Sequence, residues 1–405
     1  MSHTGITMYG TAWCGDCKRA KQFFGEQRVH YEFVDVDGDA EGMAFVEQVN
    51  EGKQIIPVIV FDDGTKLVEP SNAELAAKLG ITTSAKRSFY DLIVVGSGPA
   101  GLTAALYGAR DGFDVLVIER AGVGGQAGIT ERLDNFPGFP DGVSGSEFAD
   151  RLRLQAERFG VEVLSAQEVT EIAVDGKYRC VTTADGSSYG AFAVLASLGS
   201  TYRRLGIRGE EDFIGAGVHF CATCDGAFYR GKDVLVIGGG NSAAEESLFL
   251  TKFADSVTIV TRDDKLSATK VVVQKVEEHP KIRVITGAAP TAFAGESRLE
   301  RVSLSNGDEL TPDGVFVFIG LTPNTDVVKG FVDLDDAGFI TTDAALQTSV
   351  EGVFAAGDVR HGSTKQAASA AGEGAAVALG IRRYLEPLLA GASETPRGAA
   401  EHQLV

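Results

Sequence analysis

The chain lacks the features that would place it in a membrane, in a secretory pathway or on nucleic acid. None of its apolar runs reaches the roughly 20 residues that a membrane-spanning helix needs. The start, MSHTGITMYGTAW, has neither a basic region nor a long apolar stretch, so it does not predict a secretory signal. Basic residues number 37 against 56 acidic ones, and a net charge of −19 argues against binding to phosphates. We expect a cytoplasmic protein without a membrane or nucleic-acid partner.

Cysteine is also scarce, with five residues in 405. Four of them form two C-x-x-C pairs, Cys14 with Cys17 and Cys221 with Cys224. In the reducing cytoplasm such pairs are more often catalytic or metal-binding than structural. The fifth, Cys180, lies alone in the strand-like stretch YRCVTT, and we expect it to contribute packing only.

What the chain has in quantity is apolar residues, at 44%, and glycine, with 50 residues. This composition is typical of α/β proteins with many tight turns. A chain of 405 residues is too long for one ordinary core, so two or three domains are expected.

Residues 1–80 predict a small sheet flanked by helices. Strand-like and helix-like patterns follow each other there in the order β-α-β-α-β-β-α, from ITMYG to NAELAAKLG. The polar, non-periodic stretch at 81–88, ITTSAKRS, is predicted to be a linker. Fully extended, such a linker spans at most about 28 Å.

A nucleotide-binding unit begins at Asp91. The apolar strand LIVVG runs into Gly96, Gly98 and Gly101, and a helix and a second strand ending at Glu119 follow. The glycines allow a tight turn, a close approach to a pyrophosphate and close helix–strand packing. The helix N-terminus stabilises phosphate charge, and Glu119 is placed to accept hydrogen bonds from a ribose.

A second unit of the same kind begins at Asp233, which makes an internal repeat and implies two nucleotide sites. It has Gly238, Gly240 and, in the third place, Ala243. Its second strand ends at Thr261 without an acid. Arg262 there would favour the 2′-phosphate of NADP, but Asp263 and Asp264 would repel it, so both NADH and NADPH fit this pattern.

Two nucleotide sites and a late Gly357–Asp358 pair suggest a flavin enzyme that receives electrons from a nicotinamide. We therefore expect an α/β protein with an N-terminal thioredoxin-like fold followed by two Rossmann-like domains that bind FAD and NAD(P). The predicted division is 1–80 for the first domain and 81–88 for the linker. FAD-binding parts follow at 89–205 and 325–390, with the NAD(P)-binding domain at 206–324 and a disordered tail at 391–405.

The cysteine pairs indicate electron transfer rather than a shared metal. About 200 residues separate them, whereas a four-cysteine zinc site usually joins two such turns across some 15 to 20 residues. A C-x-x-C at a helix start favours the thiolate of its first cysteine, and the second thiol resolves mixed disulfides.

The stretches YGTAWCGDCKRAKQFF, IIPVIVFDDGT and EPSNAEL resemble the glutaredoxin family, most closely its mycoredoxin branch. The resemblance covers about residues 5–80. It implies that Cys14 attacks, that Cys17 resolves and that Ile56–Pro57 is a cis-proline loop. Asp16 stands where the family has an aromatic residue or proline.

Residues from about 88 to 388 resemble low-molecular-weight thioredoxin reductase. The motifs are GSGPAG, GGQAG with DNFPGF, FCATCDGAF, GGGNSAAEE, IGLTPN, AAGDV and KQAASAAGEG. The resemblance implies that Cys224 faces the flavin, that Cys221 attacks the substrate disulfide and that Asp225 is the general acid. It implies FAD contacts at Gly96, Gly98, Pro99, Ala100, Gly101, Glu119, Gly125, Gln126, Asn135, Gly357, Asp358, Gln366 and Ala367. It implies NAD(P) contacts at Gly238, Gly240, Asn241, Ser242, Ala243 and Arg262.

The nicotinamide-reading stretch departs from that family, because Thr261, Arg262, Asp263 and Ser267 stand where it has His-Arg-Arg and a further Arg. This loss resembles the flavoprotein subunit of alkyl hydroperoxide reductase, which prefers NADH. CATC directly precedes the second glycine fingerprint, so it belongs to the nicotinamide domain. Nicotinamide and the cysteines would then take turns at one flavin, which requires that domain to rotate.

The leading hypothesis is a disulfide reductase that passes electrons from NAD(P)H through FAD and Cys221/Cys224 to Cys14/Cys17, and then to an external disulfide. That disulfide could belong to a low-molecular-weight thiol, a protein or a peroxiredoxin. The resemblance also implies a homodimer, in which the two pairs could meet within one chain or across the dimer. The alternatives are an NADH-dependent peroxiredoxin reductase, a redox sensor without turnover, and a flavin oxidase.

Overall fold

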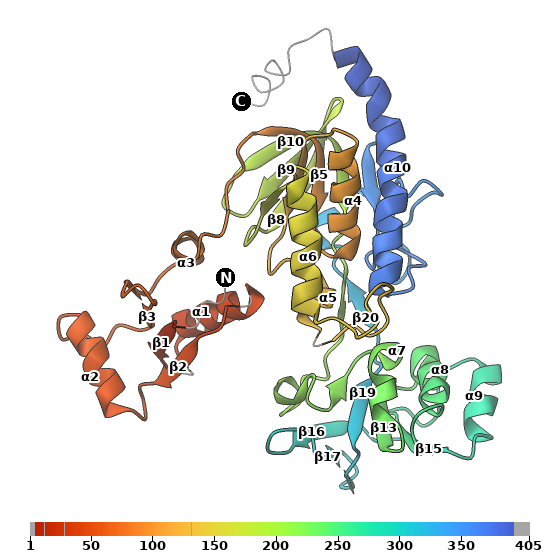
Figure 1. The fold of residues 1–405 in the computed structure, drawn as a ribbon. Coiled ribbons are helices and arrows are strands. Elements are labelled where there is room, and N and C mark those ends of the chain that lie inside the picture. The colour runs from red at the N-terminus through yellow and green to blue at the C-terminus, as the bar shows by residue number, and fades with distance from the viewer. Residues whose placement is uncertain (1–4, 12, 28, 131, 393–405) are drawn as a thin grey trace. The chain divides into compact units, whose positions relative to one another are not determined.

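A computed structural model describes residues 5–11, 13–27, 29–130 and 132–392 (Figure 1). The chain divides into two compact units. The first takes the chain up to Ile129, Gly145–Gly199 and the chain from Thr325 onward, and the second takes Thr130–Ser144 and Ser200–Asn324. In the part of the chain that is described, no helix has both the length and the apolar character that crossing a bilayer needs.

The N-terminal part of the first unit is a four-stranded sheet in the order β2-β1-β3-β4. Phe23, Phe24, Met8 and Ile59 are buried where its helices pack on the sheet. The order of elements is the predicted β-α-β-α-β-β-α. The elements are β1 (Thr7–Gly10), α1 (Gly15–Glu26), β2 (Glu32–Asp35), α2 (Ala40–Val49), β3 (Val58–Val60), β4 (Lys66–Val68) and α3 (Asn72–Lys78).

A seven-stranded sheet forms the centre of the rest of the first unit, in the order β7-β6-β5-β10-β9-β8 with β21 paired to β10. The strands are β5 (Phe89–Val95), β6 (Val115–Ile118), β7 (Glu162–Leu164), β8 (Val169–Asp175), β9 (Tyr178–Thr183), β10 (Ser188–Ala196) and β21 (Val353–Ala355). The helices are α4 (Pro99–Arg110), α5 (Gly125–Ile129), α6 (Gly145–Arg158) and α10 (Ala367–Ala392), with the short 3₁₀ turn η3 (Asp326–Val328).

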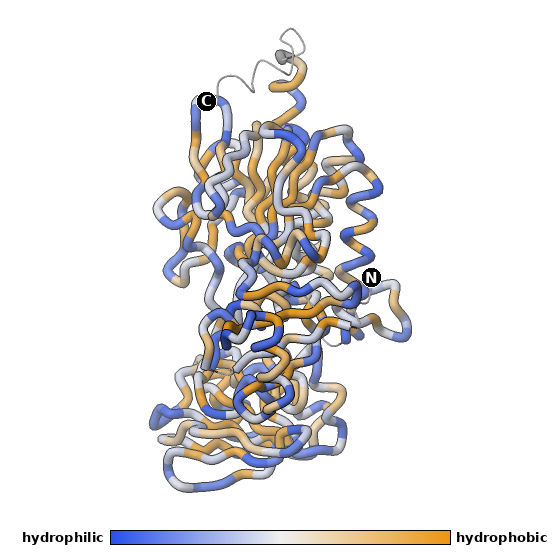
Figure 2. The backbone as a smooth tube through the Cα atoms, turned by 90° about the vertical axis from the view of Figure 1, so that its left-hand side faces the viewer, coloured by the Kyte–Doolittle hydropathy of each residue, from blue (hydrophilic) through white to orange (hydrophobic). Residues whose placement is uncertain are grey.

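Both faces of β5 are covered. Leu92 and Val94 belong to one core cluster and Ile93 and Val95 to another, as expected when successive side chains point to opposite faces of a buried parallel strand. Figure 2 shows apolar residues concentrated on the strands. Helices α4 and α10 lie side by side, and a Cβ at Gly374 would come within 2.3 Å of the Ala100 carbonyl oxygen. This close helix contact therefore requires glycine.

The second unit has a five-stranded parallel sheet in the order β12-β19-β13-β14-β15. A three-stranded antiparallel sheet, β16-β17-β18, accompanies it, and β11 pairs with β20 where the chain enters and leaves the unit. The strands are β11 (Ser200–Tyr202), β12 (Val218–His219), β13 (Asp233–Ile237), β14 (Ser256–Val260), β15 (Ile282–Ile285), β16 (Pro290–Ala294), β17 (Arg301–Leu304), β18 (Glu309–Leu310), β19 (Gly314–Val317) and β20 (Leu321–Pro323). The helices are α7 (Ala222–Asp225), α8 (Asn241–Leu250) and α9 (Lys270–Glu277), with the 3₁₀ turns η1 (Glu211–Phe213) and η2 (Gly226–Tyr229).

These sheets confirm the predicted fold class, a thioredoxin-like sheet followed by two Rossmann-like units. Residues 130–144 pack with the second unit, although they lie within the stretch 89–205 that the sequence assigned to FAD binding. The division by bound ligand stays a prediction. Helix α10 includes residues 391 and 392 of the predicted tail, and residues 393–405 lie outside the described residues.

The linker at 81–88 is fastened to the edge of the seven-stranded sheet. The Thr82 carbonyl accepts a hydrogen bond from the Ser165 N–H at 3.0 Å. The Lys86 N–H donates to Glu162 Oε1 at 2.8 Å, and the Tyr90 hydroxyl donates to the other oxygen of that carboxylate at 2.8 Å. Burial and Glu162 raise the pKa of Tyr90, so this hydroxyl keeps its proton at physiological pH. Less of the linker is free to extend than its composition suggested.

Replacing Glu162 with alanine should release the linker. Both Lys86 and Tyr90 lose their acceptor, and we expect tryptic cleavage after Lys86 or Arg87 to accelerate several-fold in limited proteolysis. Glu168→Ala, which changes an exposed carboxylate in the same region, is the matched control and should keep the wild-type cleavage rate. Equal cleavage of the Glu162→Ala variant and the control would show that Glu162 does not hold the linker.

Candidate active site

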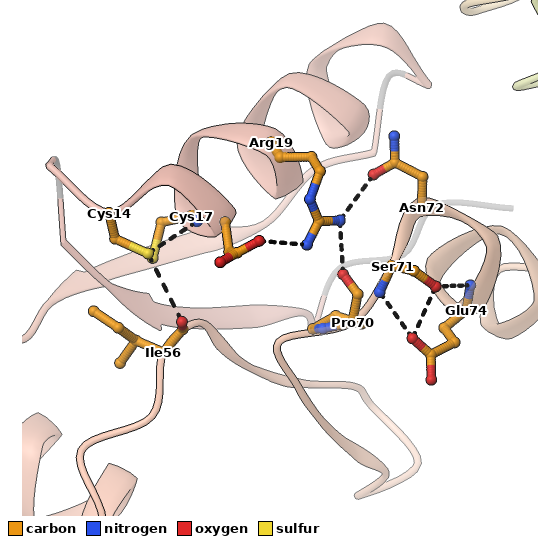
Figure 3. A network of polar contacts seen from close by, with 9 residues as sticks. Cys14, Cys17, Arg19, Ile56, Pro70, Ser71, Asn72 and Glu74 are labelled. Carbon is orange, nitrogen blue, oxygen red and sulfur yellow. Dashed lines mark hydrogen bonds and ion pairs between the residues drawn. The ribbon is translucent and has the colours of Figure 1, made fainter.

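Cys14 occupies the position just before helix α1. Its Sγ accepts a hydrogen bond from the Cys17 N–H at 3.2 Å, so it caps the helix (Figure 3). The same sulfur lies 3.7 Å from the Ile56 carbonyl oxygen, in the loop whose Ile56–Pro57 peptide is cis as the resemblance implied. N–H groups at a helix start are donors for a negatively charged sulfur, which suits an attacking thiolate.

Cys17 is fully buried, whereas Cys14 is 8% exposed. Burial, followed by the hydrogen bond and the charge interaction with Cys14, raises the pKa of Cys17 to about 12. A thiol with that pKa is ionised in only about one molecule in 100,000 at pH 7. Reduced Cys17 is therefore a thiol, and Cys14 is the sulfur that a partner can reach first.

The surface next to Cys14 is made of one exposed aromatic residue and a fixed ion pair. Trp13 is 68% exposed, and its Nε1–H donates to Asp37 at 2.6 Å. Asp16, the departure from the glutaredoxin pattern, pairs with Arg19 at 3.0 Å. Arg19 also donates to the Pro70 carbonyl at 2.8 Å (Figure 3). Arg19 thus links Asp16 to the loop before α3 and offsets the charge of its carboxylate.

Alkylation should distinguish the two thiols. In reduced protein at pH 7, iodoacetamide should modify Cys14 readily and leave Cys17 unmodified. The reason is that Cys17 is inaccessible and its raised pKa keeps it protonated until the pH approaches 12. Peptide mass spectrometry of the Cys14→Ser variant is the check, since Cys17 should stay unmodified there also. Rapid labelling of Cys17 at pH 7 in that variant would contradict the burial.

The second cysteine pair lies where β12 ends and the short helix α7 begins. Cys221 stands just before α7 and is disulfide-bonded, while Cys14, Cys17 and Cys180 are free. The Asp225 N–H donates to the Cys221 carbonyl oxygen at 3.1 Å, which closes the turn of α7. The Asp225 carboxylate lies 3.2 Å from His219 Nδ1. His219 is not among the site residues that the sequence predicted.

The first glycine fingerprint forms a tight turn between β5 and α4. A Cβ at Gly101 would approach the Gly96 carbonyl oxygen to 2.1 Å, so the helix start packs directly on the strand end. Gly98 precedes α4 without a side-chain cap, and a Cβ there would point into open space. Free N–H groups beside open space suit a pyrophosphate, whose charge the helix start stabilises.

Glu119 is buried and already has three internal donors. One oxygen accepts from the Ser97 N–H at 2.8 Å and from the Ser97 hydroxyl at 2.7 Å. The other accepts from the Ala121 N–H at 2.8 Å. A carboxylate has about four acceptor sites, so roughly one is left for a ribose hydroxyl. Glu119 therefore also stabilises the glycine turn itself.

The late Gly357–Asp358 pair lies beside the start of α10. Gly357 has φ of +79°, and a Cβ there would come within 2.9 Å of the Ala100 side chain. Burial raises the pKa of Asp358, whose carboxylate receives only a long hydrogen bond, 3.4 Å, from the Ser363 hydroxyl. A half-buried carboxylate whose hydrogen bond from Ser363 is this long fits a ligand that supplies hydroxyl donors, such as the ribityl chain of FAD.

Most of the other residues that the resemblance assigned to FAD lie near these turns in the same unit. Gly125 begins α5, and a Cβ on it would come within 3.5 Å of the Gly98 Cα, so two glycine turns face each other. Gln126 follows in α5, and Gln366 and Ala367 stand at the start of α10. Asn135 is the exception to this grouping, because its segment Thr130–Ser144 belongs to the second unit. Its role stays a prediction.

The second fingerprint repeats the tight turn with alanine in the third place. A Cβ at Gly238 would come within 2.4 Å of the Phe318 carbonyl oxygen, and Gly240 precedes α8 without a side-chain cap. Ala243 replaces the third glycine, and its Cβ lies 3.1 Å from the ideal Cβ position of Gly238. At the end of β14, Arg262 is 85% exposed and only 3.9 Å from Asp263. An arginine this free can turn toward a nucleotide phosphate.

Comparison with known proteins identifies a family for each of the two parts of the chain. The sequence profile of the pyridine nucleotide-disulphide oxidoreductase family matches residues 90–374, and the glutaredoxin profile matches residues 6–65. A bifunctional thioredoxin reductase/thioredoxin of Mycobacterium leprae is 43% identical over 313 residues, which cover 76% of this chain and 68% of that protein. A thioredoxin reductase of Listeria monocytogenes is 39% identical over 75% of this chain and 97% of its own length.

Solved structures support the same family assignment. Thioredoxin reductase from Streptococcus pyogenes has a TM-score of 0.71 at 40% identity and covers 74% of this chain and 99% of its own. These relatives are reductases of disulfides, which does not favour a sensor, an oxidase or a peroxiredoxin reductase. The chain therefore belongs to the pyridine nucleotide-disulphide oxidoreductase family, as a FAD- and NAD(P)H-dependent disulfide reductase of the thioredoxin reductase type with a glutaredoxin domain at its N-terminal end.

Proposed function

We propose that this reductase uses its own glutaredoxin domain as the carrier that delivers electrons to an external disulfide. The observation that supports this most is the presence of both sites in one chain. Cys14, the more exposed thiol of its pair, lies at a helix start with Cys17 fully buried behind it, and the reductase part has its own CATC pair. The Mycobacterium leprae relative is likewise named for a reductase and a thiol carrier in one protein. FAD, when bound, supplies the two-electron exchange that links NAD(P)H oxidation to disulfide reduction.

Within the reductase part, we assign attack on the carrier disulfide to Cys221, exchange with the flavin to Cys224 and proton donation to Asp225. Cys221 stands just before α7 and Asp225 ends that helix, so one short turn brings the sulfur and the acid into one local structure. The Cys221 thiolate forms a bond to one carrier sulfur while the carrier S–S bond breaks. The electron pair of that bond goes to the departing sulfur, which takes a proton.

Within the carrier, Cys14 would form the mixed disulfide with the external substrate. Cys17 would then attack Cys14, release the second substrate thiol and leave the Cys14–Cys17 disulfide to be reduced again. The high pKa of Cys17 means that it must lose its proton during this step rather than before it. The exposed indole of Trp13 and the carboxylate of Asp16 border the approach to Cys14. The exposed indole favours a substrate with an apolar group beside its disulfide.

We assign FAD to the first fingerprint and NAD(P)H to the second. Backbone N–H groups at Gly98 and Gly125, the remaining acceptor site of Glu119, and Asp358 would hold FAD. Pro99, Ala100, Gly96, Gly101, Gln126, Asn135, Gly357, Gln366 and Ala367 complete that proposed set. Gly238, Gly240, Asn241, Ser242, Ala243 and Arg262 form the proposed nicotinamide-nucleotide set. A homodimer and a cytoplasmic location belong to the same proposal, and sedimentation of the purified protein tests the dimer.

Replacing Cys14 with serine tests the carrier role. NAD(P)H-dependent reduction of 2-hydroxyethyl disulfide should fall at least about ten-fold, because the only accessible carrier sulfur is lost. Reduction of ferricyanide, which needs no cysteine thiol, should stay unchanged. Cys180→Ser is the matched control, since Cys180 lies in β9 and belongs to neither pair, and it should keep full turnover. Full disulfide turnover by the Cys14→Ser variant would mean that substrates react directly with Cys221.

Nucleotide choice should depend on Arg262. Arg262→Ala should raise KM for NADPH by roughly ten-fold and change KM for NADH little, because a guanidinium pairs with the 2′-phosphate that only NADPH has. Asp263→Asn should shift KM for NADPH the opposite way, since it removes a repelling charge. Steady-state kinetics with both nucleotides is the measurement. An Arg262→Ala variant with unchanged KM for NADPH would exclude this arginine from the nucleotide site.

A further inference from the structure

A hydrogen-bonded chain of three side chains lies next to CATC. Asp225 Oδ2 is 3.2 Å from His219 Nδ1, and His219 Nε2 is 2.6 Å from the Tyr229 hydroxyl. The three residues come from the end of β12, the end of α7 and the end of η2, so a short stretch of sequence folds back on itself to make the chain. The side chains of His219 and Asp225 are only 11% and 21% exposed.

The surroundings hold this geometry. The His219 ring packs against Phe316 of β19 and against Tyr229, with ring centroids 5.3 Å apart in both pairs. A Cβ at Gly314 would come within 2.2 Å of the Tyr229 ring, so glycine leaves the space that the phenol fills. The other charged groups around the phenol are Asp313, Arg298 and Lys232. The imidazole therefore has a fixed orientation between one carboxylate and one phenol.

The hydrogen bonds determine where the protons lie. Burial, followed by the charges of Asp225 and Asp313, raises the pKa of Tyr229 to about 12, so the phenol keeps its proton at neutral pH. When the imidazole is neutral, the phenol donates to Nε2, and the ring proton must lie on Nδ1, where it faces Asp225. One further proton can then be held between the carboxylate and the imidazole.

We propose that His219 is a positioning residue that shares one proton with Asp225, so that Asp225 stays able to protonate a departing thiolate at neutral and mildly alkaline pH. The inference rests on the proposed role of Asp225 as general acid. When Cys221 attacks a disulfide, the new S–S bond forms and the old one breaks. The departing sulfur receives the electron pair of the old bond and a proton from Asp225. That proton is the one shared with His219, so its transfer leaves a carboxylate beside a neutral imidazole, and solvent supplies the next proton to the pair. The phenol keeps Nε2 oriented.

A merely structural role for His219 makes a different prediction. If the imidazole only holds the carboxylate in place, a side-chain amide whose N–H lies near the position of Nδ1 should preserve activity at every pH. His219→Asn supplies such an N–H but cannot take up a proton. His219→Gln, whose amide reaches toward Tyr229, is the second variant and also cannot titrate.

The test is the pH dependence of kcat/KM for 2-hydroxyethyl disulfide in the full-length holoenzyme between pH 6 and 9.5. In both variants we expect the alkaline loss of activity to begin about one pH unit lower, with about a ten-fold loss at pH 8 and a smaller loss at pH 6. Ferricyanide reduction should equal that of wild type. His279→Asn, which changes a histidine after α9, is the matched control and should keep the wild-type profile.

Two results would overturn the inference: a wild-type profile in the variants, or a loss that is equal at every pH. If the His219→Asn variant does not fold, as judged by circular dichroism, the His219→Gln variant decides. Asp225→Asn separates this inference from the function on which it rests. A slow Asp225→Asn variant beside fully active His219 variants would contradict only the shared proton, whereas a fully active Asp225→Asn variant would remove the general acid itself.

Discussion

The structure depends on one repeated constraint, which is that a strand leads into a turn and then into a helix whose first N–H groups have no acceptor within the helix. At α1 those groups face the sulfur of Cys14, while at α4 and α8 they lie behind Gly98 and Gly240. A helix start stabilises negative charge, whether it belongs to a thiolate or to a phosphate. The carrier domain and the two nucleotide units therefore use the same local device for different chemistry. The residue at the turn, sulfur or glycine, decides which charge is held.

How closely the helix approaches the strand distinguishes the two nucleotide turns. At the first turn a Cβ in the third position would meet a carbonyl oxygen at 2.1 Å, which only Gly101 avoids. At the second turn alanine takes the third position, and Ala243 is fully buried there. Glu119 adds to the rigidity of the first turn through its bonds to Ser97. Such rigidity suits a tightly held cofactor, whereas a nicotinamide that must enter and leave in each cycle does not require it.

Local sequence patterns predicted most of the fold, because each predicted feature depends on residues that are close together in the chain. The order of elements in the carrier domain and the two glycine turns could be anticipated from neighbouring residues, and the cis Ile56–Pro57 peptide from the family resemblance. Features made by distant side chains could not. Glu162 holds Lys86 from far along the chain, and residues 130–144 pack with a unit other than that of their neighbours. His219 was missed for a related reason, since its partners Asp225 and Tyr229 face it only after the chain turns back.

The two cysteine sites also pose one problem of proton balance. Burial makes Cys17 a resolving thiol that side reactions cannot reach, but it makes the Cys17 thiolate a poor leaving group, because a thiolate with a pKa of about 12 leaves slowly unless a proton follows it. A reductase that must break the Cys14–Cys17 disulfide therefore needs an acid that is still protonated at neutral pH. An isolated carboxyl with an ordinary pKa is almost fully ionised there. A carboxyl that shares a proton with an imidazole of fixed orientation meets this need. Burial of Cys17 protects the carrier thiol but requires a proton donor when the carrier disulfide is broken, and the side chains around CATC supply that donor.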